Sequence, residues 1–484
     1  MVFSSMLFLF LFLVLCYGIY LIVPGLKARN RVLLIFSLIF YAWGGPPLVL
    51  LLVLMTFVCY GGALILECEP MGHRRRTFYT AVTVGLCLGI LGLFKYTGWL
   101  VGTVQDIFHL GGTLPQVALP IGISFYTFQL ISYVVDVHRG ETPAQRNYFT
   151  LLLYVSLFHQ CIAGPIVRYV DVCNELHDRA ITLNDTWQGL MRFTVGLAKK
   201  AVLANTCATI ADSLLPSSVE AMAEQSALAV ALGMLAYMLQ IYLDFSAYSD
   251  MAIGMARMIG FHFKENFDYP YTAHSVSDFW RRWHISMSSF FRDYVYIPLG
   301  GNRVTVPRHI LNILVVWGLT GLWHGASWNF VLWGLYFALF LLLEKFVFGW
   351  KKEKPHGVVL WLRRLYTLAV VYVGWMIFRF DDMALMGAAF KSLLGFGGGF
   401  ADKTATTTAL NYIFFLLVAL MACSPIVPRV GAWLGRRQTA DGAVGKVARS
   451  VGHAVAVAAP VLLLVLSALA LVGDSYNPFL DFRF

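Results

Sequence analysis

Long apolar runs recur along the whole chain and give the first indication of its structure. Among them are Val2–Val23, Leu48–Leu66, Ala81–Val101, Ala227–Leu243, Val331–Leu343, Tyr366–Phe378, Leu410–Met421 and Val455–Val472. Runs of this kind are typical of membrane-spanning helices, and the span-length rule predicts about eleven spans. The first run has no charged segment before it and no small-residue cleavage site, so we interpret it as a span and not as a signal peptide.

The composition indicates the same class of protein. Of the 484 residues, 59% are hydrophobic and 13% are charged, and the mean hydropathy is +0.70. Soluble globular proteins have about half apolar and about a quarter charged residues, so that class is excluded. We predict an all-α fold: a polytopic bundle of transmembrane helices with re-entrant or amphipathic helices, forming one integral membrane domain over residues 1–484.

The net charge of +10 follows from basic residues that gather between the apolar runs. They are Lys27, Arg29 and Arg31, Arg74–Arg76, Lys345 to Arg364, and Arg429 to Arg449. The positive-inside rule assigns these loops to the cytoplasm, so no nucleic acid partner is expected. Lys199 and Lys200 conflict with a simple up-and-down topology because they interrupt an apolar stretch between Phe149 and Leu228. Re-entrant or broken segments that line a cavity would remove the conflict.

Motifs for metals and cofactors are absent from the sequence. The eight cysteines are scattered, with no C-x-x-C pair and no Cys/His ligand spacing. No glycine-rich nucleotide motif is present either. We therefore predict no metal site, no redox site and no bound cofactor.

Polar residues inside the apolar runs are informative because each is costly in hydrocarbon unless it is paired or faces a cavity. Gln129, Ser132 and Asp136 are spaced three and four residues apart and so share one helical face. One interpretation is a set of hydrogen bonds between helices that holds the bundle together. The other is a polar pathway through the membrane.

A second polar group lies in the segment from Tyr237 to Phe261. Tyr237, Gln240 and Asp244 follow one helical stripe, while Asp250 and Arg257 are seven residues apart and could pair along a neighbouring face. For the two aspartates we favour a pathway or a site, because carboxylates inside a membrane usually line one.

The segment Ser275–Arg303 is too charged to span a membrane. Its apolar residues recur at helical spacing and its polar residues lie opposite: Phe279, Trp283, Met287, Phe290 and Tyr294 against Arg281, Ser288, Ser289 and Arg292. Ser275 and Asp278 have capping-box spacing at its start, and Pro298 with Gly300–Gly301 ends it. We predict an amphipathic helix at the cytoplasmic surface or dipping into the protein.

Two histidines have contexts that allow a functional or a structural role. His284 lies on the flank of the apolar stripe of that helix and is expected to face protein and not water. His324 is the single histidine in the otherwise apolar run from Trp317 to Lys345. Each would serve in a site as a proton acceptor, or would donate a structural hydrogen bond to a neighbouring helix.

Five motifs in order resemble the membrane-bound O-acyltransferase superfamily, and within it the bacterial branch that contains alginate O-acetyltransferases. They are "LPIGISFYTFQLISYVVDVHRG", "CIAGPIVRY", "QIYLDFSAYSDMAIGMARMIGF", "FWRRWHISMSSFFRDYVYIPLGGNR" and "NILVVWGLTGLWHGASWNFVLWGLY". The resemblance covers roughly residues 92–375, which we take as the motif-bearing core, followed by C-terminal spans over 376–484. It implies a helix bundle pierced by a central funnel or tunnel.

The resemblance also implies a catalytic pair. His324, in "LWHG", matches the histidine regarded as catalytic across the superfamily, and His284, in "RRWHIS", matches the second histidine of this branch. A buried imidazole stays neutral because burial disfavours its charged form, so it is a usable general base. His324 is expected to take the proton from an acceptor hydroxyl that attacks an acyl thioester. His284 would position the acceptor or hold Asp244 or Asp250.

Further residues are expected to bind substrate or line the tunnel: Gln240, Asp244, Tyr248, Asp250, Arg281, Arg282, Asn302, Trp323, Trp328 and Asn329. Trp323 and Trp328 would wall the tunnel, and Gly321 and Gly325 would let the backbone approach the acyl chain. Two interpretations stay open for the arginines Arg281, Arg282, Arg292 and Arg303. They would recognise the phosphates of the donor, or they would anchor the chain at the cytoplasmic face.

The function implied by the resemblance is transfer of an acetyl group from cytoplasmic acetyl-CoA across the bacterial inner membrane to a polysaccharide outside it. Alginate fits best as acceptor, a periplasmic acetyltransferase partner is expected, and membrane lipids surround the chain. Peptidoglycan, cellulose and D-alanyl transfer to teichoic acid are alternatives. A transporter or flippase would also need intramembrane Asp and His residues, but it would release no CoA. A structural scaffold is disfavoured, because it has no reason to bury ionisable residues.

Overall fold

The computed structural model describes residues 2–113, 119, 120, 122–161, 164–350, 355–438 and 443–473, and every regular element among them is helical. The first half of the chain contains η1 (Phe8–Phe12), α1 (Leu13–Ile22), α2 (Leu26–Ala42), α3 (Pro46–Cys68), α4 (Arg74–Phe108), α5 (Ile123–Arg139), α6 (Tyr148–Ser156), η2 (Phe158–Gln160), α7 (Tyr169–His177), α8 (Leu183–Ala198), η3 (Lys199–Ala204), α9 (Asn205–Leu214), α10 (Val219–Ala223) and α11 (Ala227–Met258). The all-α prediction is confirmed over these residues.

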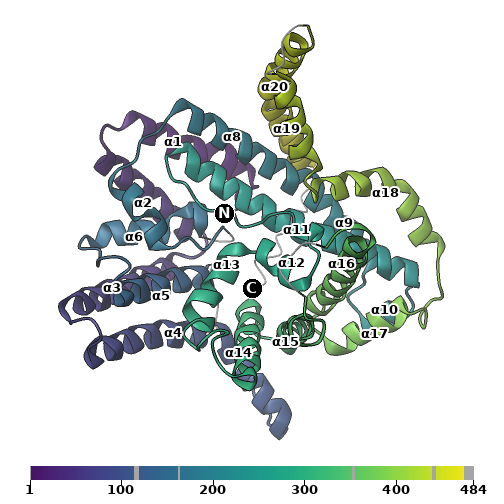
Figure 1. Ribbon diagram of the computed structural model, residues 1–484, viewed down its shortest axis with the longest axis horizontal. Coiled ribbons are helices and arrows are strands. Elements are labelled where there is room, and N and C mark those ends of the chain that lie inside the picture. The colour runs from purple at the N-terminus through teal and green to yellow at the C-terminus, as the bar shows by residue number, and fades with distance from the viewer. Residues whose placement is uncertain are drawn as a thin grey trace.

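The second half continues the bundle (Figure 1). It contains η4 (Pro270–Thr272), α12 (Val276–Arg282), α13 (Ile285–Phe291), η5 (Arg292–Tyr296), α14 (Val306–His324), α15 (Trp328–Leu342), η6 (Leu343–Val347), α16 (Gly357–Arg379), α17 (Met383–Leu393), α18 (Lys403–Ala422), α19 (Ile426–Gln438) and α20 (Ala443–Gly473). In Figure 1, α19 and α20 project from the other helices.

Seven helices in the described parts of the chain are long and apolar enough to cross a membrane. They are α3, α4, α11, α15 continued through η6, α16, α18 and the Arg449–Gly473 part of α20. The shorter apolar helices Phe8–Ile22 and Met383–Leu393 add to them. The prediction of a polytopic membrane protein is confirmed. The estimate of about eleven spans exceeds seven because further apolar segments are shorter or interrupted by charged residues.

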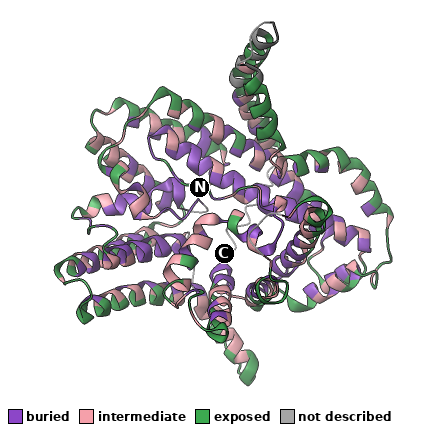
Figure 2. Ribbon diagram, in the orientation of Figure 1, coloured by how far each residue is buried: buried purple, intermediate pink, exposed green. Residues whose placement is uncertain are grey.

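The helix α11 forms the centre of the bundle. Its most apolar stretch is 78% buried, whereas the corresponding stretches of the other candidate spans are 12–33% buried. It contacts α8, η3, α9, α16, α17 and α18. Figure 2 shows buried residues concentrated along α11 and α5, with exposed residues on the outer helices. The polar residues of α11 therefore face protein and not lipid.

The topological conflict at Lys199 and Lys200 is resolved by ion pairs to α11. Lys200 Nζ lies 2.8 Å from Asp244 Oδ1, and Lys199 Nζ lies 2.6 Å from Asp250 Oδ2. Both lysines lie in η3, a π-helical segment that joins α8 to α9 without a break in the helical path. The predicted pairing of Asp250 with Arg257 is wrong, because Arg257 instead contacts Asp185 at 3.2 Å.

The prediction of a single amphipathic helix over Ser275–Arg303 is also wrong. The chain forms two short helices, α12 and α13, that meet at His284, whose φ of +43° is left-handed. The predicted start is confirmed, since Ser275 Oγ accepts a hydrogen bond from the Asp278 amide at 2.9 Å. The sequence pattern does not reveal the break, because apolar residues keep their helical spacing on both sides of His284.

The basic segments lie mostly at helix ends and less in loops than predicted. Arg74–Arg76 form the first turn of α4, and the segment Arg429 to Arg449 is largely helical within α19 and α20. Residues 351–354 and 439–442 of the predicted basic loops, and residues 162 and 163 of the "CIAGPIVRY" motif, lie outside the described residues.

Candidate active site

The helix α14 ends at His324, and the chain turns there into α15. Glycines allow the two helices to pack closely. A Cβ at Gly321 would overlap the carbonyl oxygen of Phe330, and one at Gly334 would overlap the carbonyl oxygen of Trp317. At Gly325 the space is filled by the Phe330 ring. The expectation that Gly321 and Gly325 admit an acyl chain is therefore wrong, because they admit a neighbouring helix.

The His324 ring is buried among aromatic side chains. Its ring centroid lies 4.9 Å from that of Trp323, 4.9 Å from that of Trp333 and 5.3 Å from that of Phe378. Lys95 of α4 donates hydrogen bonds to the carbonyl oxygen of Trp323 and, at 3.2 Å, to Ser124 Oγ. An ammonium group is thus held next to the end of α14, where the helix dipole places partial negative charge.

His284 lies close to the same tryptophan. Its ring centroid is 5.8 Å from that of Trp323 and 4.7 Å from that of Phe245, and its side chain is 0% exposed. The prediction that His284 faces protein and not water is confirmed. His284 Nδ1 lies 3.2 Å from Asn266 Oδ1. The structure thus brings the two candidate catalytic histidines to one tryptophan, although 40 positions separate them in the sequence.

A cavity of about 300 Å³ leads toward His324 from the side of the basic residues. Its walls include one face of α14, from His309 through Val316 to Thr320. His309 and Thr320 are eleven positions apart, a length of roughly 16 Å along a helix. Thr320 precedes His324 by about one helical turn, so this end of the cavity lies one turn from the histidine along α14.

The outer end of this cavity is cationic. Arg281, Arg292 and Lys345 line it, and all three lie on the side that the positive-inside rule assigns to the cytoplasm. Arg292 Nε also lies 2.6 Å from Asp293 Oδ1, and Arg168 lies 2.6 Å from Oδ2 of the same carboxylate. Burial would raise the pKa of Asp293, but the hydrogen bonds from the two arginines outweigh burial and lower it. Arg292, at the mouth of the cavity, is therefore held in place by a charged carboxylate that it shares with Arg168.

Aromatic side chains separate the inner end of the cavity from His324. Trp280 lines the cavity, and its ring centroid lies 4.7 Å from that of Trp317 and 5.4 Å from that of Trp333. Trp333 in turn contacts His324. A donor that enters the cavity would reach the histidine only past these rings.

A second cavity, of about 940 Å³, lies between α8, α11 and the C-terminal helices. Asp250, Lys199 and Arg192 line its charged side, and Arg192 also pairs with Glu265. Asn266 is part of the same wall. Asp250 therefore faces a cavity, as expected for a pathway carboxylate, but both of its oxygens bind basic side chains.

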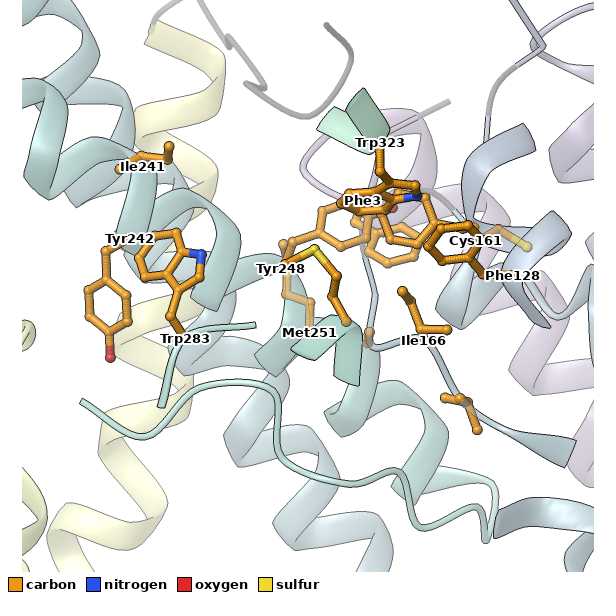
Figure 3. Packing of buried hydrophobic residues seen from close by; sticks show 14 of the residues in the cluster. Phe3, Phe128, Cys161, Ile166, Ile241, Tyr242, Tyr248, Met251, Trp283 and Trp323 are labelled. Atoms are coloured by element: carbon orange, nitrogen blue, oxygen red, sulfur yellow. The ribbon is translucent and has the colours of Figure 1, made fainter. Parts of the chain in front are cut away.

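Three further predicted residues are buried along α11: Gln240, Asp244 and Tyr248. Asp244 is held by Lys200, and the Tyr248 ring stacks on Phe3 with centroids 4.3 Å apart. Figure 3 shows Tyr248 and Phe3 beside Trp323 and Phe128 in one cluster. Tyr248 thus packs inside the buried aromatic core of the bundle.

The remaining predicted residues have contacts of their own. Asn302 is exposed in the loop before α14, and Trp328 is 54% exposed and packs on Trp99 at 5.1 Å. Asn329 Nδ2 donates to the carbonyl oxygen of Ile377 at 3.4 Å, which ties α15 to α16. Arg282 is held by Asp278 and Asp268.

Sequence reasoning missed Lys95, Asn266 and Trp333. Lys95 had a usable signal, since it is a lysine close to the end of the apolar run Ala81–Val101, where charge is costly. Asn266 had none, because it lies in a polar segment 18 positions before His284. Trp333 is one of several tryptophans in an apolar helix, and only the packing distinguishes it.

Comparison with known proteins agrees with this geometry. Residues 143–387, just over half of the chain, match the membrane-bound O-acyltransferase family. The chain is 37% identical over 510 residues to the "Probable alginate O-acetylase" of Azotobacter vinelandii, with 100% of both chains covered. It is 40% identical over 410 residues to the protein of that name from Pseudomonas syringae pv. tomato, covering 82% of this chain and 76% of the relative.

A third relative carries a different acceptor in its name. The peptidoglycan O-acetyltransferase of Helicobacter pylori is 31% identical over 435 residues, covering 82% of this chain and 80% of its own. The family match includes both candidate histidines, the cationic cavity and the central helix α11. Together with the multi-pass helical fold, these similarities establish that the chain belongs to the membrane-bound O-acyltransferase family.

Proposed function

We propose that this protein moves an acetyl group from cytoplasmic acetyl-CoA through the bacterial inner membrane for O-acetylation of an exported polysaccharide, most specifically alginate. One observation carries the proposal most directly. His324 is buried at the end of α14, and a cavity with a cationic mouth follows the same helix to within one turn of it. The names of the relatives in Azotobacter and Pseudomonas support acetyl as the group and alginate as the acceptor.

The proposed chemistry is acyl transfer from a thioester to a hydroxyl. The acceptor oxygen forms a bond to the acetyl carbonyl carbon, the bond from that carbon to sulfur breaks, and CoA leaves as a thiolate. His324 takes the hydroxyl proton during the attack and returns it to the leaving sulfur. The aromatic shell of Trp323, Trp333 and Phe378 keeps water out, which favours transfer over hydrolysis.

Donor recognition falls to the outer end of the 300 Å³ cavity. The phosphates of CoA would meet Arg281, Arg292 and Lys345, since guanidinium and ammonium groups bind phosphate oxygens well. Its thin pantetheine arm would follow the face of α14 toward Thr320. The predicted recognition of phosphate is thus proposed for Arg281 and Arg292. Arg303 is exposed and does not line this cavity.

The acceptor is proposed to approach from the opposite, extracytoplasmic side. The positive-inside rule places the start of α4 in the cytoplasm, and Lys95 lies 21 positions further along that helix. Lys95 and the end of α14 therefore lie toward the outer face. A periplasmic acetyltransferase partner would receive the acetyl group there or present the polymer to it.

The test compares O-acetyl ester in the secreted polysaccharide and in the cell wall of four strains. They are a deletion strain and deletion strains complemented with wild type, His324→Ala or His73→Ala, at matched abundance in the membrane. His73 is a control, being a half-exposed histidine at the start of α4. Loss of polysaccharide ester in the deletion and His324→Ala strains alone would support the proposal.

Three other outcomes would redirect the assignment. Ester loss from the cell wall alone would make peptidoglycan the acceptor. Full acetylation of both polymers in the His324→Ala strain would remove His324 from the chemistry. Membranes that transport a polymer without releasing CoA from acetyl-CoA would identify a transporter or flippase.

A further inference from the structure

The side chain of Asn266 lies beside the ring of His284 and has a defined orientation. Its Oδ1 atom lies 3.2 Å from the Ser286 amide nitrogen, which can only donate a hydrogen bond. Its Nδ2 atom donates to Ser249 Oγ on α11 at 3.1 Å. The Ser286 amide therefore fixes the orientation of the Asn266 side chain, with Oδ1 and not Nδ2 next to His284.

That orientation determines the position of the imidazole proton. His284 Nδ1 lies 3.2 Å from Asn266 Oδ1, which has only lone pairs to offer. Ser286 Oγ also lies 3.4 Å from Nδ1, but its hydrogen goes to Asn266 Oδ1 at 2.8 Å. Two lone pairs on Nδ1 and Oδ1 would repel at 3.2 Å, so Nδ1 carries the hydrogen and donates it to Asn266. In a neutral imidazole the other nitrogen, Nε2, then keeps its lone pair. His284 Nε2 is buried and has no hydrogen-bond partner among the described residues.

Asn266 also holds the backbone around this histidine. The amide of Ile285 donates to the Asn266 carbonyl oxygen at 2.9 Å, and Ser286 Oγ donates to Asn266 Oδ1 at 2.8 Å. His284 itself has the left-handed φ of +43°, which is strained in a residue with a side chain. Ring and backbone are thus fixed by the same asparagine, which belongs to neither α12 nor α13.

We infer that Asn266 is a positioning residue that fixes His284 as the Nδ1–H tautomer and so presents the lone pair of Nε2 to a hydroxyl of the acceptor other than the attacking one. The inference rests on the proposed function for the role of the lone pair, but the tautomer itself follows from the hydrogen bonds alone. In the reaction, His284 Nε2 accepts a hydrogen bond from a second hydroxyl of the acceptor and so positions the attacking hydroxyl, whose single proton His324 takes.

The tautomer is tested without activity. The purified full chain is labelled with ¹⁵N-histidine, and the His284 signals are identified by their loss in His284→Ala. We expect one-bond N–H coupling at Nδ1 and none at Nε2 in the wild type. In Asn266→Ala the proton should redistribute between the two nitrogens, whereas in Asn266→Asp, which keeps the acceptor oxygen, it should stay on Nδ1. A proton on Nε2 in the wild type would overturn the inference.

The consequence for catalysis is tested on the same variants by CoA release from acetyl-CoA with alginate oligosaccharide as acceptor. Asn266→Ala should lower kcat about 10- to 100-fold with little change in the KM for acetyl-CoA, and Asn266→Asp should recover part of kcat. Asn30→Ala is the control, because it also removes an asparagine side chain that is hydrogen-bonded at both ends, here to the Leu176 carbonyl oxygen and to Arg179.

The outcomes separate this inference from the proposed function. Equal losses in Asn266→Ala, Asn266→Asp and Asn30→Ala, together with a lower unfolding temperature, would show a structural role and overturn the inference. Wild-type kcat in Asn266→Ala would overturn it as well. Wild-type kcat in His284→Ala would instead remove His284 from the proposed reaction, and the tautomer measured by ¹⁵N would still stand.

Discussion

Lys200 and Asp244 form an ion pair inside the bundle, with Nζ and Oδ1 2.8 Å apart and side chains only 3% and 2% exposed. The pair joins η3 to the central helix α11. It explains how a lysine is tolerated within an otherwise apolar stretch, because each charge neutralises the other away from water. Lys200 thus binds the Asp244 carboxylate, which the sequence analysis assigned to substrate binding or to the lining of the tunnel.

Removing one partner of this pair should destabilise the protein strongly. Lys200→Met leaves the Asp244 carboxylate buried without its ammonium partner, and the free energy of unfolding should fall by about 3–5 kcal/mol. The double variant Lys200→Met/Asp244→Leu should recover most of that loss, since no buried charge remains. Thermal unfolding of the wild type, Lys200→Met, Asp244→Leu and the double variant in detergent measures the coupling energy between the two side chains. Additive losses in the double variant would contradict the prediction.

The contact between α14 and α15 should depend on Gly321. In Gly321→Ala the new methyl group overlaps a backbone oxygen of α15 that cannot move alone, so stability should fall by about 1–3 kcal/mol. Gly318→Ala on the same helix is the control, because its Cβ meets no atom within 4 Å and alanine favours a helix. Unfolding temperature and membrane abundance measure both. Equal behaviour of the two variants would exclude the close contact.

Donor affinity should depend on the arginines of the cationic cavity. Arg281→Glu and Arg292→Glu should each raise the KM for acetyl-CoA about tenfold or more, because each removes one charge-assisted contact with phosphate. Arg303→Glu changes the same charge outside the cavity and should have little effect. The comparison is made with CoA release at constant ionic strength. Equal effects of all three would indicate a general attraction by surface charge.

Asp293 should make stability depend on pH. Its pKa is lowered in the folded protein by Arg292 and Arg168, so its stabilisation is present above the ordinary aspartate pKa of about 4 and is lost as pH falls through the lowered value. Asp293→Asn should therefore lower the unfolding temperature near neutral pH, and the difference from wild type should shrink below about pH 4. A difference that does not change with pH would show that charge is not responsible.

The sequence predicted the type of fold and the burial of His284, because both depend on local patterns. Long apolar runs define spans by length, and His324 lies in a motif where an ionisable ring is unexpected. The burial of His284 followed from its place beside an apolar stripe. The fold class, the buried face of the histidine and the N-terminal cap at Ser275 were all within reach of such reasoning.

The partners of charged residues could not be predicted in the same way. Asp250 could pair with Arg257 on its own helix, but Arg192 reaches it from α8 and Lys199 from η3, and nothing in either segment identifies that contact. Gly321 and Gly325 suggested room for a substrate, whereas the room is taken by Phe330 of the next helix. The break at His284 depends on Asn266, which binds it from another segment.

The length of α4 links the membrane to His324. Its 35 residues extend for roughly 52 Å, well beyond the roughly 30 Å hydrocarbon layer, so the helix must tilt or protrude, and the angle follows bilayer thickness. Only 17% of its most apolar stretch is buried, yet it carries Lys95, which holds the carbonyl group just before His324. A change in bilayer thickness that altered the tilt of α4 would therefore also act on the end of α14, through Lys95.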